Sequence, residues 1–312
     1  MTMRVMPFLL IGAFAFELVA CTGGGGSGRS SEAPPVEAPP GLEPSSPPSP
    51  SPPNDDGLGP FVAHRIPVPP LGECLGTEGV VLRTLIIGNS NIYYWDLPRL
   101  LSVLSRSAPS SCPRVDAEGF TRGGQNLMRL WEDGDSLGRD LATTIRAGGY
   151  DVVVISESID LLELDPPFTQ FVSYATRIVE AARAVNARPI LYASPYVDQP
   201  GHAGFVEMAT PQIDLGVRLG VRVATPGLAW LRVWERLPDV FLHHTDHSHP
   251  GFKGSLISSM HLYAVMTRGS PMGMTMAPAV DCHDEPCPTV GDAEGVVFRE
   301  AAWAEARQRL AP

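Results

Sequence analysis

Short apolar runs alternate with amphipathic helical patterns from residue 80 to the end of the chain, and this alternation constrains the fold more than any other feature. Residues 80–87, 150–155 and 189–194 are such runs. Apolar runs without polar alternation are typical of strands that are covered on both faces. A repeated order of strand and helix predicts parallel strands joined by right-handed crossovers. We therefore expect an α/β fold, a single three-layer domain with a parallel sheet flanked by helices.

Helices are expected between and after these runs. Asp96 is a candidate N-cap, and Pro98 and a stripe of leucines follow it. Apolar residues at helical spacing predict a second amphipathic helix over residues 171–185. Further helices are expected near residues 254–267 and 296–310.

The first twenty residues have the features of a signal peptide. Arg4 lies in a short positive start, an apolar stretch too short to span a bilayer follows, and Leu-Val-Ala immediately precedes Cys21. "LVAC" resembles the lipobox of bacterial lipoproteins, which implies that Cys21 is lipidated and anchors the chain to a membrane. Thr22 follows the cysteine where an aspartate would favour inner-membrane retention, so the outer membrane or cell surface is favoured. The alternative is a plain signal peptide with an accidental cysteine.

Residues 21–72 are predicted to be a tether. The 39 residues after Cys21 contain eleven prolines and hardly any large apolar side chains. Such a segment cannot bury enough surface to offset its conformational entropy, and its proline-rich part should be extended. We expect the folded domain to span residues 73–312, a length that suits one α/β domain.

The formal net charge of the chain is −11, and its basic residues form no stripe. Nucleic-acid phosphates are bound by clustered cations. The charge therefore argues against a nucleic-acid partner, and no cofactor is expected.

Four cysteines remain besides Cys21, an even number in the oxidising compartment that an exported protein reaches. Three pairings are possible. We favour Cys74 with Cys112, which would flank the first strand–helix unit, and Cys282 with Cys287, which would close a short loop. A metal site built from these thiols is the alternative, but their spacing lacks paired C-x-x-C elements.

The first apolar run ends at Gly88-Asn89-Ser90, a small polar turn before the next helix. Ligands of parallel α/β sheets bind at the carboxyl ends of the strands, so a serine there is a candidate nucleophile if a base can reach it. Asp246 and His249 lie three residues apart, which lets the carboxylate bind one imidazole nitrogen and leaves the other to accept a serine proton. The alternative is an ordinary turn, a capping aspartate and a surface histidine.

These blocks resemble those of the SGNH hydrolase superfamily, related to GDSL esterases and lipases. The shared features are Ser90 after the first strand, a glycine after the second strand in "GFTRGGQNLMRLW", and Asp246-x-x-His249-Pro250 before the last core helix. The similarity covers residues 80–310 and is closest to a bacterial branch with Gly-Asn-Ser in place of Gly-Asp-Ser. The resemblance implies a flavodoxin-like fold, Ser90 as nucleophile, His249 as general base and then acid, and Asp246 as the residue that orients the imidazole.

The resemblance also implies an oxyanion hole formed by the backbone N–H groups of Ser90 and Gly124. A third donor in this superfamily is usually an asparagine side chain after the third strand, but this chain reads "VISESID" there. Ser156 or Ser158 could supply that donor, whereas an ionised Glu157 cannot donate. Loss of one oxyanion donor typically lowers turnover by about 100- to 1000-fold.

The resulting hypothesis is a serine esterase that hydrolyses or transfers an acyl ester, with O-acetyl groups on envelope or extracellular carbohydrate as candidate substrates. One alternative is a non-catalytic binding lipoprotein with a degenerate oxyanion hole. Another is a metal-dependent hydrolase that uses the histidine cluster 243–249, although adjacent histidines cannot all face one ion. Trp95, Trp131 and Trp230 could line a carbohydrate site, but core packing is the simpler explanation for each.

Overall fold

The computed structural model describes residues 72, 74, 78–158, 168–195, 202–280 and 287–310. All of them lie in one compact unit, which spans residues 63–312. The predicted signal peptide and Cys21 fall outside the described residues. Within these ranges, no helix is both long and apolar enough to cross a membrane.

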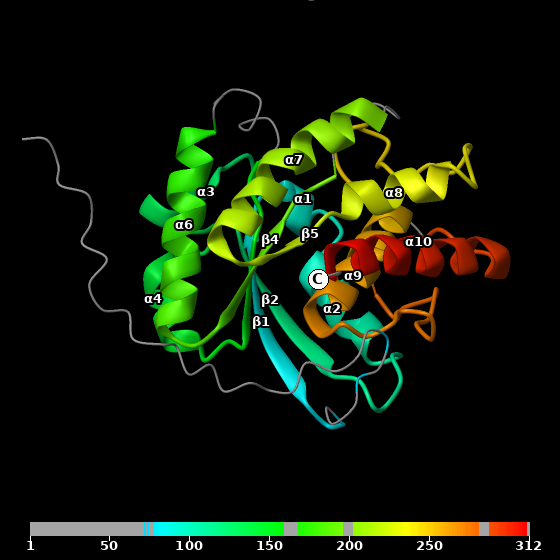
Figure 1. Cartoon of the computed structure of the whole chain (residues 1–312), viewed down its shortest axis with the longest axis horizontal. Helices are drawn as coiled ribbons and strands as arrows, with labels where there is room; N and C mark the ends of the chain where they lie inside the picture. Colours follow the sequence, from blue (N-terminus) through cyan, green and yellow to red (C-terminus); the bar gives the residue numbers. More distant parts are fainter. Residues whose placement is uncertain are drawn as a thin grey trace, which may run out of the picture. The chain divides into compact units, whose positions relative to one another are not determined.

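Five parallel strands form the sheet at the centre of this unit (Figure 1). Their order across the sheet is β2-β1-β3-β4-β5. The strands are β1 (Val81–Gly88), β2 (Arg114–Thr121), β3 (Val152–Ile155), β4 (Arg188–Tyr192) and β5 (Arg222–Ala224). The expected α/β class is therefore confirmed, and the predicted runs coincide with β1, β3 and β4 to within about two residues, the usual uncertainty of element boundaries.

Helices cover both faces of the sheet (Figure 1). One face carries α3 (Leu127–Glu132), α4 (Leu141–Gly148), α6 (Thr169–Ala184) and much of α7 (His202–Leu219). The other face carries α2 (Leu97–Ser105), α8 (Pro226–Trp234), α9 (Phe252–Thr267) and α10 (Asp292–Leu310). Asp96 caps α2 as predicted, because its carboxylate accepts a hydrogen bond from the Arg99 N–H at 3.2 Å.

Successive residues of β1 enter different cores, as the alternation of side chains along a strand requires. Leu85 and Ile87 pack with α3, α4 and α6, whereas Ile86 packs with α2 and α9. In α9 every residue except Lys253 is buried. A helix that is buried on nearly all sides is typical of the centre of a protein, so α9 anchors the end of the loop that precedes it.

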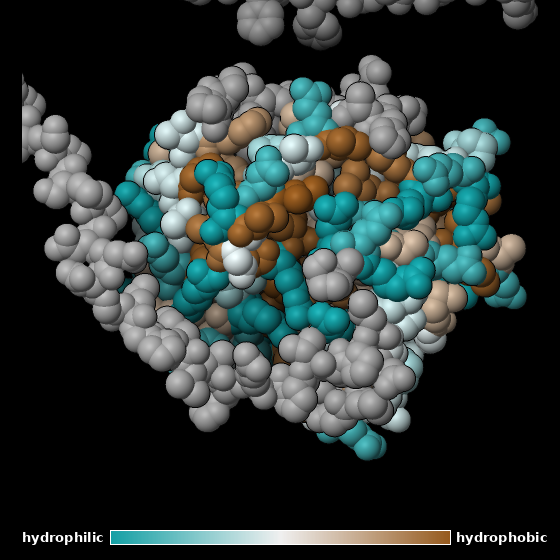
Figure 2. Space-filling model, viewed as in Figure 1, coloured by the Kyte–Doolittle hydropathy of each residue, from teal (hydrophilic) through white to brown (hydrophobic). Residues whose placement is uncertain are grey.

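Hydrophobic residues gather along α7, near the middle of the molecular face drawn in Figure 2. Two apolar side chains of this helix, Val206 and Val217, are exposed. Hydrophilic residues border this hydrophobic area on the same face (Figure 2).

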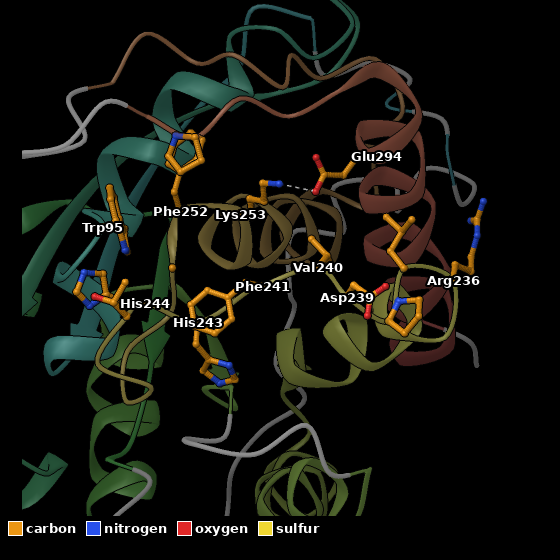
Figure 3. Close-up of a pocket in the computed structure, with 15 residues that line it drawn as sticks. Trp95, Arg236, Asp239, Val240, Phe241, His243, His244, Phe252, Lys253 and Glu294 are labelled. Carbon is orange, nitrogen blue, oxygen red and sulfur yellow. Dashed lines mark hydrogen bonds and ion pairs between the residues drawn. The ribbon is translucent and has the colours of Figure 1, made fainter. Parts of the chain in front are cut away.

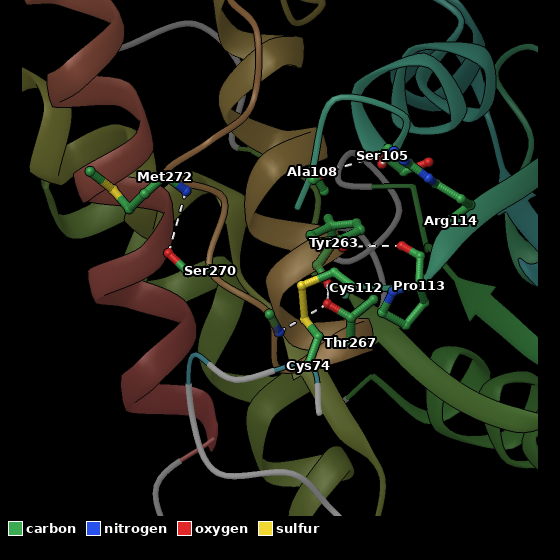
Figure 4. The surroundings of a disulfide bond; sticks show 11 residues. Cys74, Ser105, Ala108, Cys112, Pro113, Arg114, Tyr263, Thr267, Ser270 and Met272 are labelled. Carbon is green, nitrogen blue, oxygen red and sulfur yellow. Dashed lines mark hydrogen bonds between the residues drawn. A yellow bond between two sulfur atoms is a disulfide. The ribbon is translucent and has the colours of Figure 1, made fainter. Parts of the chain in front are cut away.

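A disulfide joins Cys74 to Cys112, the first pairing favoured from the sequence (Figure 4). It ties the segment before β1 to the start of β2. The Tyr263 hydroxyl of α9 donates to the Pro113 carbonyl oxygen at 3.1 Å next to this bridge. Cys287 is also in a disulfide, while Cys282 lies outside the described residues, so the second pairing stays a prediction.

Candidate active site

Ser90 is the first residue of the short helix α1 (Ser90–Tyr93), directly after the carboxyl end of β1. The turn is tight: a Cβ atom on Gly88 would lie 2.5 Å from Cγ1 of Ile92, so only glycine fits there. Asn89 caps the helix, since its side-chain oxygen accepts a hydrogen bond from the Asn91 N–H at 3.0 Å. The turn thus presents a half-buried serine at the edge of the sheet where ligands of this fold class bind.

Asp246 and His249 are hydrogen-bonded to each other in the loop between α8 and α9. The distance from His249 Nδ1 to Asp246 Oδ2 is 2.7 Å. The other carboxylate oxygen accepts from the backbone N–H groups of Ser248 at 2.9 Å and His249 at 3.0 Å. Burial tends to raise the pKa of Asp246, but these hydrogen bonds outweigh it and hold the pKa below its usual range. The carboxylate is therefore ionised and fixes the imidazole through Nδ1, which leaves Nε2 as the basic nitrogen.

Backbone hydrogen bonds close this loop on itself. The His244 N–H donates to the His249 carbonyl oxygen, and the Gly251 N–H donates to the Leu242 carbonyl oxygen, both at 2.8 Å. A Cβ atom on Gly251 would lie 2.3 Å from the His243 carbonyl oxygen. Only glycine therefore lets the two sides of the loop approach so closely. The Asp246–His249 pair is consequently held by a defined turn.

Tyr94 joins this loop to the helix that carries Ser90. Its ring stacks on the His249 imidazole with 4.3 Å between ring centroids and 9° between planes. The Tyr94 N–H donates to the Ser90 carbonyl oxygen at 2.9 Å, so Tyr94 lies one helical turn after the serine. The structure therefore places His249 against α1, and among the described residues no hydrogen bond links Ser90 to His249. Catalytic hydrogen bonds are often long before substrate binds.

His244 is a second histidine on the same carboxylate, a contact that the sequence analysis missed. Its Nδ1 lies 3.2 Å from Asp246 Oδ2 and 3.2 Å from the Tyr94 hydroxyl oxygen. The sequence spacing gives no sign of the contact with Tyr94, because Tyr94 and His244 are 150 residues apart.

The other histidines of the cluster 243–249 point elsewhere. His243 is buried, with its ring 5.1 Å from Trp230 and 6.0 Å from Trp234. His247 is exposed and lies beside Phe241. In the part of the chain that the structure describes, no three His, Cys, Asp or Glu side chains are placed to hold a metal ion.

Gly124 lies in the loop after β2, with a positive φ of 63° and an exposed backbone. A Cβ atom on its neighbour Gly123 would lie 2.7 Å from the Tyr93 hydroxyl oxygen, so this loop packs against α1. Within the described ranges, neither the Ser90 nor the Gly124 N–H has an acceptor in the protein. An oxyanion hole is built from N–H donors that the protein itself does not use.

Glu157 replaces the side-chain donor expected after β3 and serves as an acceptor. Its carboxylate is buried and accepts hydrogen bonds from the backbone N–H groups of Leu127 at 3.1 Å and Ser158 at 2.7 Å. The first of these bonds fixes the start of α3, next to the loop that carries Gly124. Glu157 thus stabilises the loop, and in its ionised form it cannot donate to an oxyanion.

Ser156 and Ser158 are both buried after β3. The hydroxyl of Ser156 lies 2.8 Å from that of Ser194 at the end of β4, and either oxygen can be the donor. One hydrogen bond between two hydroxyls uses only one of their O–H groups as a donor, so the other O–H of this pair can donate elsewhere. The third oxyanion donor suggested for Ser156 or Ser158 stays a prediction.

No protein-family model and no curated protein matches this sequence. Several solved structures are similar at low identity. A protein from Slackia heliotrinireducens assigned to the SGNH hydrolases is 19% identical with a TM-score of 0.47, over 60% of this chain and 99% of that one. A DUF4886-family protein from Bacteroides uniformis is 12% identical with a TM-score of 0.49, over 72% and 94%.

An acetylxylan esterase from Geobacillus stearothermophilus is 15% identical with a TM-score of 0.44, over 62% of this chain and 96% of that one. Of these three structures, the Slackia heliotrinireducens protein is the one that carries the name of the superfamily that the motifs resemble. The α/β class follows from the parallel sheet itself. The activity proposed below rests on the geometry of the site.

Proposed function

We propose that this protein is a serine ester hydrolase of the SGNH type, with Ser90, His249 and Asp246 as its catalytic triad. The observation that carries the proposal is the 2.7 Å Asp246–His249 hydrogen bond, in a loop whose histidine stacks on Tyr94, the C-cap residue of the helix that begins at Ser90. A carboxylate that fixes an imidazole next to a strand-end serine is the arrangement required to activate a hydroxyl nucleophile.

Acyl transfer at this site follows from the available groups. His249 Nε2 takes the Ser90 hydroxyl proton as Oγ attacks the ester carbonyl carbon, and the N–H groups of Ser90 and Gly124 stabilise the resulting oxyanion. His249 then gives the proton to the leaving alcohol, and the acyl group stays on Ser90. Water, deprotonated by His249, attacks the acyl-serine and releases the acid, and the proton returns to Ser90.

The substrate class proposed is an acyl ester on a small molecule or carbohydrate, with O-acetyl groups of envelope or extracellular polysaccharide as the specific candidate. The exported location predicted from Cys21 supports this choice. The competing function is a non-catalytic binding lipoprotein. The observation that favours it is Glu157, which provides acceptors where a donor would be expected.

Substitution of the triad tests the proposal. Ser90→Ala and His249→Ala should each abolish turnover of p-nitrophenyl acetate, and the double variant should be scarcely worse, because members of a triad act as a unit. Asp246→Asn should keep the fold and lower turnover by about 10,000-fold, the size of the matching effect in serine proteases, because it favours the wrong imidazole tautomer.

Two further measurements separate the alternatives. A fluorophosphonate probe should label Ser90 in the wild-type protein and should not label the His249→Ala variant. Turnover should be unchanged by a chelator, whereas its loss would favour the metal-dependent hydrolase. If the folded wild-type protein neither reacts with the probe nor hydrolyses esters, the catalytic proposal is refuted and the binding-protein alternative is favoured.

The lipid anchor is a separate proposal that rests on "LVAC". The mature protein should partition into the detergent phase of a phase-separation assay, and Cys21→Ser should move it to the aqueous phase. A wild-type protein recovered intact from the aqueous phase would rule out acylation of Cys21.

A further inference from the structure

A cavity of about 590 Å³ adjoins the loop that carries Asp246 and His249 of the proposed triad (Figure 3). It lies between Trp95, the segment after α8, the start of α9 and Glu294 of α10, and it reaches the triad loop at His244. Ser90, Gly124, Asp246 and His249 do not line it. Its volume is in the range of small-molecule sites, so it is a candidate second binding site beside the catalytic groups.

Aromatic rings form one part of its wall. Trp95 and Phe252 meet edge to face, with 5.9 Å between their centroids. Phe241 also lines the cavity and is 52% exposed. Trp95 packs against the hydrophobic core, as predicted from the sequence, and it also lines this cavity. Covering a water-exposed aromatic ring with a ligand is favourable, because apolar surface is removed from water.

Four charged side chains lie in the wall beside apolar residues such as Leu237 and Val240, and their charges balance. Two cations, Arg236 and Lys253, and two carboxylates, Asp239 and Glu294, line the cavity (Figure 3). Lys253 Nζ lies 2.7 Å from Glu294 Oε1, and Arg236 pairs with Glu300 on α10. An anionic ligand would have to compete with these carboxylates for both cations. An alkyl chain would have to desolvate the charges without replacing their hydrogen bonds.

We infer that this cavity binds a neutral sugar unit. The C–H face of a sugar ring covers aromatic rings, and its hydroxyl groups can both donate to carboxylates and accept from cations that are already paired. Since His244 lines the cavity and contacts Asp246, a bound sugar would lie next to the proposed triad. The inference therefore deepens the carbohydrate part of the proposed function, while the binding itself requires no ester hydrolysis.

Calorimetric titration of the full mature chain carrying Ser90→Ala tests the inference. The neutral probes are cellotetraose, xylotetraose and tetra-N-acetylchitotetraose, and trigalacturonate and octanoate are the anionic and alkyl probes. At least one neutral tetrasaccharide should bind, and adding Phe241→Ala should weaken it about tenfold, since one aromatic contact is lost. Leu137→Ala is the matched control, because Leu137 is 80% exposed and does not line the cavity.

The inference is overturned if no neutral tetrasaccharide binds, if Phe241→Ala leaves the affinity unchanged, or if trigalacturonate or octanoate binds better than every neutral probe. Its failure is distinguishable from failure of the proposed function. Sugar binding by a protein with no Ser90-dependent esterase activity supports the cavity and refutes the hydrolase. Ser90-dependent hydrolysis without sugar binding refutes only the cavity.

Discussion

Acid should destabilise the domain through His261, a fully buried residue of α9 that holds three helices together. Its Nε2 accepts a hydrogen bond from the Thr225 N–H, just before α8, at 2.8 Å. Its Nδ1 lies 3.1 Å from the Ala302 carbonyl oxygen in α10 and must therefore carry the proton. Burial lowers the pKa of His261 to about 4, although the carboxylate of Glu305 opposes this shift. Protonation would have to break the bond from Thr225, so the native ring is neutral.

The size of the effect follows from the two pKa values of His261. An unfolded histidine has a pKa near 6.5, so the difference of about 2.5 units corresponds to about 3 kcal/mol at about 1.4 kcal/mol per unit. Between these pKa values the unfolded chain binds more protons than the native one. This stabilisation is therefore fully present above about pH 6.5 and is lost as the pH falls towards 4.

Urea unfolding at several pH values between about 7 and 5 measures this loss. The pKa of Glu305 is also lowered, with burial opposed by His261, Arg309 and its other partners, so its contribution is lost only at more acidic pH. His261→Gln, which can still accept and donate but cannot titrate, should flatten the dependence of the free energy of unfolding on pH. His247→Gln, at an exposed position, is the control. Equal pH slopes for wild type and His261→Gln would refute the reasoning.

Three further outcomes are expected. Replacing Cys74 and Cys112 together by alanine should lower the free energy of unfolding, measured in urea, by about 4 kcal/mol on the chain-entropy model for a separation of 38 residues; an unchanged midpoint would contradict this. Glu157→Ala should destabilise the domain by about 2 kcal/mol or more and lower kcat, because the buried Leu127 N–H loses its acceptor. Glu157→Gln keeps an acceptor and should retain most of the stability and most of kcat. His244→Ala should lower kcat about tenfold, the equivalent of one charge-assisted hydrogen bond, and full activity would show that its contact with Asp246 is irrelevant.

The sequence by itself determined what depends on neighbouring residues. Continuous apolar runs predicted three of the five strands closely, since a strand buried on both faces needs apolar side chains on both. The Asp246–His249 bond was predictable for the same reason, because both residues lie in one short loop. The short helices α3 and α4 were not predicted, because six and eight residues show too little periodicity.

Only the tertiary structure decided how distant segments meet at the site. Tyr94 stacks on His249, and His244 shares the Asp246 carboxylate, because α1 and the loop before α9 come together at one edge of the sheet. From the sequence, Glu157 stands where a hydrogen-bond donor is expected. In the structure its carboxylate accepts a hydrogen bond from the Leu127 N–H and so supports the loop that carries Gly124. Local preferences are short-ranged, whereas contacts between residues far apart in the chain depend on how the helices and strands pack, which no single segment encodes.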